Sequence, residues 1–138
     1  MQKDDHTPAD FLLIAEDVYL SLKEGGKAVA TTPHEAAWER LAISLCFFAA
    51  FNAALNELKK DEGFVMEYHE LIKHGNKNIF RFVIDKALQK FKLDDLLELY
   101  ELWLNAFFRL PPDYNVDLKD VEKAVKIAGN CLRAMQFI

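Results

Sequence analysis

An uncharged run from Leu41 to Asn56 is the feature that most constrains how this chain can fold. It is shorter than the roughly 18–20 apolar residues that cross a bilayer, so we expect it inside the protein and not in a membrane. A helix that is apolar nearly all round its circumference is normally the most buried one. The run therefore predicts a central helix, with large side chains on one face and alanines on the opposite one: Leu41, Leu45, Phe48 and Phe51 against Ala42, Ala49 and Ala53.

Start and stop signals mark further helices on both sides of this run. Thr7 as a cap and Pro8 in the first turn open a first helix, which Gly25-Gly26 ends. Thr32 and Glu35 have the capping-box spacing of the central helix. That helix runs to about Lys60, and the patterns after it predict a short helix over 64–75, a helix from Asn78, one after Asp94 that Pro111-Pro112 ends, and a last one from Asp117 to Met135 with Asp120 as capping partner.

These patterns predict an all-α fold. We find no strand pattern, internal repeat or linker in the 138 residues, a length typical of one domain. The composition, 51% hydrophobic, is ample for a core. We predict a single domain over residues 1–138, an up-and-down bundle of four long helices plus one or two short ones.

The charge is unevenly distributed along the chain. The net charge is −5, yet the segment from Lys73 to Lys92 has six basic residues and one acid. Its strip of Lys73, Lys77 and Arg81 is a candidate for binding RNA or an acidic partner. The alternative is a solvated helix face whose bases pair with the acids that follow: Asp94, Asp95, Glu98 and Glu101.

Few residues suggest metal or thiol chemistry. Cys46 and Cys131 lie inside apolar helical patterns, which predicts buried free thiols in a reducing compartment. Glu70 and His74 are one helical turn apart, but two ligands are too few for a zinc site. We therefore predict a surface pair, no metal and no cofactor. Ser44 is expected to form a hydrogen bond to the backbone of the preceding helical turn.

The N-terminal residues lack a secretion signal, so we expect a cytoplasmic protein.

Aromatic side chains recur at helical spacing. Leu96, Leu99, Trp103 and Phe107 form the core face of one helix. Phe82 and Phe108 lie beside the main stripes and are candidates for a second apolar face against a partner chain. In the last helix, Gly129 lowers helix stability by up to about 1 kcal/mol relative to alanine, which suggests a close packing contact there.

The segment from Arg109 to Tyr114 combines a fixed cation, two prolines, the carboxylate of Asp113 and a phenol at the exit of an apolar helix. Arginine binds phosphate in a bidentate manner. The alternative is structural: Arg109 bonds the last carbonyls of the helix and pairs with Asp113, while Tyr114 packs over the loop.

Three segments together resemble the HEPN superfamily of nucleotide-binding helical domains. The first is Arg40 to Ala54, where Ala42-Ile43-Ser44 leads into paired aromatics and alanines. The second, Arg109 to Tyr114, is similar to the R-x-x-x-x-H element or its degenerate R-x-x-x-D-Y form. The third is the acidic-start helix from Asp117 to Met135.

The resemblance implies a bundle, often dimeric, in systems that process or sense RNA, and a gene that accompanies a small nucleotidyltransferase, as in toxin–antitoxin pairs. In active ribonucleases of the superfamily the arginine and histidine act on RNA without metal. Arg109 matches that arginine, whereas Tyr114 stands at the histidine position. Tyrosine, with an unperturbed pKa of about 10, is a poor general base near neutral pH, although it can donate a hydrogen bond or stack on a base.

Two functions follow from these observations. The first is a HEPN-like domain that binds RNA or a nucleotide through Arg109, Asp113 and Tyr114, aided by Lys73, Lys77 and Arg81, or that forms one half of a toxin–antitoxin-type pair. Its partner is a second copy or a small nucleotidyltransferase, and whether Arg109 and Tyr114 also catalyse a reaction stays open. The second is a non-enzymatic helical adaptor or homodimer.

Overall fold

The central helix of the fold is α2 (Pro33–Leu58), the longest of six helices in a computed structural model that describes residues 7–24, 33–75, 78–108 and 116–138. Its inward residues are fully buried: Ala42, Ile43, Cys46, Phe47, Ala49, Ala50, Ala53 and Ala54. The central helix predicted from the uncharged run is thereby confirmed.

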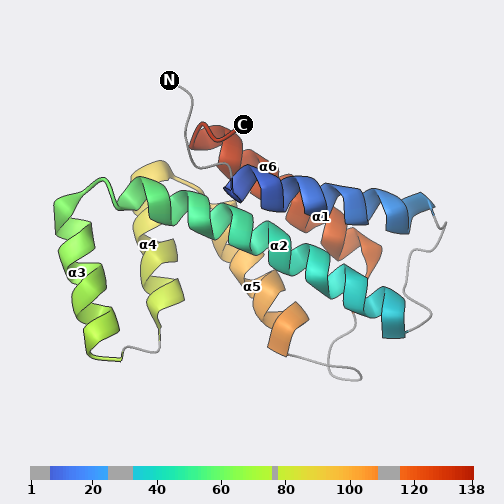
Figure 1. Ribbon diagram of the computed structural model, residues 1–138, viewed down its shortest axis with the longest axis horizontal. Coiled ribbons are helices and arrows are strands. Elements are labelled where there is room, and N and C mark those ends of the chain that lie inside the picture. The colour runs from blue at the N-terminus through green and yellow to red at the C-terminus, as the bar shows by residue number, and fades with distance from the viewer. Residues whose placement is uncertain (1–6, 25–32, 76–77, 109–115) are drawn as a thin grey trace.

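Four helices pack around α2 (Figure 1). α1 (Thr7–Glu24) and α6 (Leu118–Ala134) lie along one side, where the small alanines of α2 let neighbouring backbones approach. α4 (Ile79–Phe91) and α5 (Asp95–Phe108) lie on the other side, where α2 presents Phe47 and Phe51. The described residues contain no strand, so the all-α bundle is confirmed.

α3 (Glu62–Lys73) lies at one end of the molecule and packs mainly on α4 (Figure 1). The contact is aromatic: the rings of Phe64 and Phe82 stack with centroids 5.6 Å apart and an interplanar angle of 6°. Phe82 is therefore covered by α3 of the same chain, which corrects its assignment to a surface for a partner chain.

Helix ends follow the predicted signals closely. Asp117 caps α6 in a complete capping box with Asp120, and Gly75, at φ +67°, follows the end of α3. α1 begins at Thr7 itself, one residue earlier than the capping interpretation placed it. Thr32, Gly25-Gly26 and Pro111-Pro112 lie outside the described residues.

Two residues predicted to be in the core are exposed. Leu41 retains 44% of its surface although it belongs to the buried helix α2. Phe107 retains 58% because it lies in the last turn of α5. Helical spacing identifies an apolar face but not the length over which neighbouring helices cover it.

The stretch Ala36–Leu58 is long and apolar enough to cross a membrane by length and composition, and 67% of its most apolar window is buried inside the fold. Such burial is the pattern of a core helix.

Within α2, Ser44 donates from its Oγ to the carbonyl oxygen of Arg40 at 3.0 Å. The predicted bond to the preceding turn is confirmed.

Gly129 is buried on α6. A Cβ added there would meet the guanidinium of Arg133 at 3.3 Å, and the three nearest atoms all belong to that side chain. Arg133 folds back over the glycine and donates to Asn130 at 2.8 Å. The close packing contact expected at Gly129 is therefore present, and its partner is a flexible side chain of the same helix.

We predict that Gly129→Ala raises the stability by up to about 1 kcal/mol, because alanine is the better helix former and Arg133 can move aside. Thermal unfolding followed by circular dichroism measures the change. Gly75→Ala is the matched control: it has open space but a φ of +67°, so it should destabilise. A loss of stability in Gly129→Ala would contradict the assignment.

Cys46 and Cys131 are buried free thiols, as predicted. Burial raises the pKa of each thiol from the ordinary value of 9.0 to about 12. Between these pH values the unfolded chain releases thiol protons that the folded chain retains. Unfolding is therefore favoured as the pH rises through this window.

We predict that stability falls as the pH rises from 9 toward 12, and that Cys46→Ala with Cys131→Ala makes the fall shallower. Urea denaturation midpoints of the two proteins along this pH series measure the difference, and the shared tyrosines and lysines cancel in the comparison. If the denaturation midpoints of the two proteins fall in parallel with pH, the assigned role of the two thiols is contradicted.

Candidate interface at the end of α5

A cluster of aromatic rings connects the core to the surface at the C-terminal end of α5. Trp103 is 5% exposed, and its ring stacks on Phe47 of α2 with centroids 4.4 Å apart and an interplanar angle of 11°. Phe48 and Phe80 also contact this indole, at 5.6 and 5.3 Å. Trp103 therefore joins α2, α4 and α5.

Phe107 and Phe108 continue this cluster onto the surface. Each ring lies 5.8 Å from Trp103, and the two rings are 5.2 Å apart. They are nevertheless 58% and 65% exposed. A pair of rings held from beneath but open to solvent is preorganised to stack on a base or to pack on a protein.

The indole N–H of Trp103 is buried and has no acceptor in the described part of the chain. An unsatisfied buried donor costs about 1–3 kcal/mol. This N–H lies beneath the exposed ring pair at the end of α5.

Polar groups border the same ring pair. A shallow hollow of about 480 Å³ on the outward side of α5 is lined by Glu101, Leu104, Asn105 and Phe108. An amide and a carboxylate beside an aromatic ring have the donors and acceptors that recognise the edge of a nucleobase.

α5 is fixed to α2 at this end by Arg40. Its Nη1 donates to the carbonyl oxygen of Ala106 at 2.6 Å. Ala106 lies in the last turn of α5, whose carbonyls lack helical partners. The bond holds the turn that carries Phe107 and Phe108 against α2.

The arginine segment predicted as a site directly follows this turn in the sequence. Arg109, Asp113 and Tyr114 lie outside the described residues, as does Lys77. Their predicted roles therefore stay predictions. The structure does describe the exposed ring pair, Phe107 and Phe108, which directly precedes Arg109 in the sequence.

The basic strip is partly neutralised. Lys73 is exposed in the last turn of α3, and Arg81 in the first turn of α4 donates from its Nε to Asp85 at 2.9 Å. Lys86 pairs with Glu67 at 3.6 Å. The predicted pairing with the acids after Lys92 is wrong for Arg81 and Lys86, because Arg81 pairs with Asp85 and Lys86 with Glu67. Of those later acids, Glu98 pairs with Lys123 of α6.

Arg81 is next in the sequence to a member of the aromatic cluster. It directly follows Phe80, whose ring contacts Trp103. Both partners of the Arg81–Asp85 pair are about half exposed, so the pair contributes little to stability. The guanidinium can exchange Asp85 for another anion at low cost.

An uncovered strip of α2 continues the apolar surface from this end. Leu41 is exposed, and along the same face Leu45, Phe48 and Leu55 are half-buried beside Asn52. No charged residue interrupts the strip.

The remaining predicted pair is an ordinary surface contact. His74 Nε2 and Glu70 Oε2 are 3.2 Å apart, with both side chains more than half exposed. Within the described ranges no group of three His, Cys, Asp or Glu side chains is placed to hold a metal.

Sequence reasoning missed the burial of Glu39, which is 2% exposed, because no pattern in the sequence marks this acid as buried. Trp103 was assigned to the core correctly, but its unsatisfied N–H needs coordinates to be seen. The exposure of Phe107 had one signal, its position in the last turn before Pro111-Pro112.

A comparison of the chain with protein-family models, with curated proteins and with solved structures found no match.

Proposed function

We propose that this chain is a HEPN-like helical domain that binds RNA or a nucleotide at the C-terminal end of α5. The observation that carries the proposal is the exposed ring pair Phe107–Phe108, supported by Trp103 from beneath and followed directly by Arg109. Aromatic rings stack on bases of any sequence, and a neighbouring cation binds the phosphate.

The polar border of the ring pair supports the same ligand. A base stacked on Phe108 has the Asn105 amide and the Glu101 carboxylate beside it in the same hollow. Arg109, Asp113 and Tyr114 are the proposed phosphate-binding and orienting residues, with Lys73, Lys77 and Arg81 attracting the backbone. We propose binding and not hydrolysis, because Tyr114 occupies the position of the proton-transferring histidine.

The toxin–antitoxin interpretation belongs to this proposal. In such a pair, the partner is a second copy or a small nucleotidyltransferase encoded by a neighbouring gene. The uncharged strip of α2, which begins at Leu41 near the ring pair, is a suitable contact surface for either one.

We predict that a labelled single-stranded RNA binds wild type more weakly at about 200 mM than at about 50 mM salt, because phosphate contacts release counterions. Phe108→Ala should weaken binding about 5- to 150-fold, since a stacked base contributes about 1–3 kcal/mol. Arg109→Ala should make the salt dependence shallower, by about one phosphate contact. Fluorescence anisotropy measures all three.

Met66→Ala is the matched control, since Met66 is 72% exposed on α3, away from this end; it should bind as wild type does. Salt-independent binding, or equal affinity of Phe108→Ala and wild type, would contradict the proposal.

A second candidate function is a helical adaptor or homodimer without a nucleic-acid role. The uncharged strip of α2 favours it, because a two-fold axis brings each residue of a patch near its own copy. A patch without charges avoids like-charge contacts in that arrangement.

For this candidate we predict that sedimentation equilibrium detects a dimer of wild type, and that Leu41→Glu weakens it at least about tenfold by placing carboxylates face to face. Ile72→Glu, at a 50% exposed residue of α3, is the control and should leave the dimer intact. A wild type that stays monomeric at high concentration sinks the candidate.

A further inference from the structure

The outward face of α1 carries three acids at seven-residue spacing. Asp10, Asp17 and Glu24 are all exposed. Seven residues are close to two helical turns, so the three carboxylates form one crest along the helix. None of them forms an ion pair with a residue in the described ranges. The helix as a whole has four acids and one base.

Apolar side chains flank the crest on both sides. Leu13 and Leu20, also seven residues apart, are 57% and 52% exposed on one side, and Ile14 is 50% exposed on the other. A surface helix normally keeps such residues on its buried face. α1 therefore has a second apolar surface that the bundle does not use.

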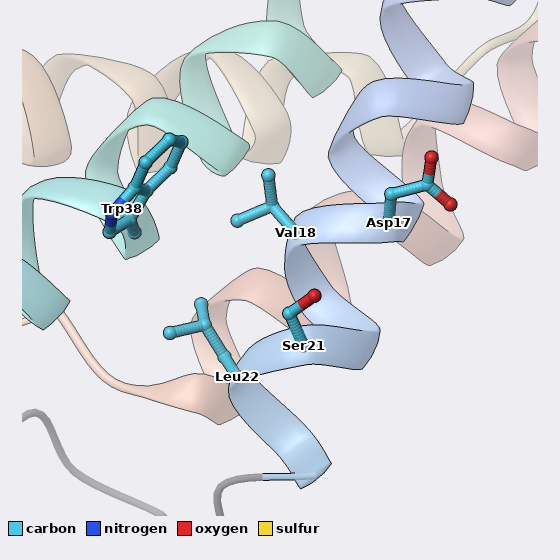
Figure 2. A pocket seen from close by; sticks show the side chains of 5 residues that line it. All are labelled: Asp17, Val18, Ser21, Leu22 and Trp38. Atoms are coloured by element: carbon cyan, nitrogen blue, oxygen red, sulfur yellow. The ribbon is translucent and has the colours of Figure 1, made fainter.

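A hollow of about 300 Å³ opens between α1 and α2 on the Ile14 side of the crest. Its walls include Val18, Leu22 and Trp38, the last of which is 42% exposed. Figure 2 shows Val18 and Leu22 pointing toward the indole, whereas the carboxylate of Asp17 points away from it. The apolar hollow and the acidic crest therefore lie on two sides of one ridge.

This geometry favours an elongated ligand. A small amine held beside Trp38 faces away from the Asp17 carboxylate. A helix laid along α1 reaches both, with an apolar side chain in the hollow and basic side chains over the crest. Helices dock on apolar grooves through residues at spacings of three, four and seven.

Three helices of a second copy, α1, α5 and α6, do not supply such a helix. Its α1 would place acids against acids, which is unfavourable. Its α6 is basic, with exposed Lys119, Lys126 and Arg133, but exposes no large apolar side chain. Its α5 exposes phenylalanines but carries only acids: Asp95, Glu98 and Glu101.

We propose that the outward face of α1 docks a basic amphipathic helix of another protein. One large apolar side chain of that helix is seated between Val18, Leu22 and Trp38, and its lysines or arginines lie over Asp10, Asp17 and Glu24. Exposed ion pairs contribute little energy each. The apolar contacts therefore supply most of the affinity, and the crest selects the sign of the charge. The inference is independent of any function at the end of α5.

The test uses the full chain and two synthetic helical peptides. One is an amphipathic peptide of leucine and lysine, and the other replaces every lysine by glutamate. Anisotropy of the labelled peptides should give at least about tenfold tighter binding of the lysine peptide. Its binding should also change the tryptophan emission, and Trp38→Phe should abolish that change because Trp103 is buried and does not line the hollow.

Asp17→Lys should weaken the lysine peptide and strengthen the glutamate peptide. Glu70→Lys makes the same change of net charge on α3, at an exposed acid outside the face, and should preserve the wild-type preference.

Four results would overturn the proposal: no binding of either peptide, equal binding of both, equal effects of Asp17→Lys and Glu70→Lys, or an emission change that survives Trp38→Phe. Self-association of wild type that Asp17→Lys abolishes would assign the face to a second copy and overturn it as well.

Discussion

The burial of α2 is the constraint on which the rest of the fold depends. Its buried side chains differ sharply in size: Ala42, Ala49 and Ala53 leave room for neighbouring backbones, whereas Phe47 and Phe51 contact rings of other helices. The aromatic side needs large partners, and Phe80, Tyr100 and Trp103 provide them.

The candidate interface is a consequence of that aromatic side. Phe107 and Phe108 belong to the same stack of rings as Trp103, but they lie in the last turn of α5 and stay exposed. Leaving a phenylalanine in water forgoes roughly 1.5–3 kcal/mol of burial. Two adjacent residues do so here, above an N–H of Trp103 that has no acceptor among the described residues, and on them we base the proposed ligand surface.

The sequence predicted the helices well because their signals are local. Caps and glycines such as Asp117 and Gly75 act within one or two turns, so they can be recognised without the fold. The exposure of a side chain, in contrast, does not depend on local signals alone. Leu41 and Phe107 occupy apolar helical positions but lie where no neighbouring helix reaches. Nor did Gly129 reveal that Arg133 would cover it. Such facts depend on helix placement, which a periodic pattern does not specify.

Charge separates the two proposed surfaces. In the two proposals, the charge at each surface matches its own ligand. The acidic crest of α1 repels phosphates and attracts a basic helix, whereas the cation of Arg109, next to the ring pair, attracts phosphates. Screening limits the reach of exposed charges to about 8–10 Å at ordinary salt, so each charge acts only on a ligand close to its own surface. The two proposals therefore place ligands of opposite charge on separate surfaces of the bundle.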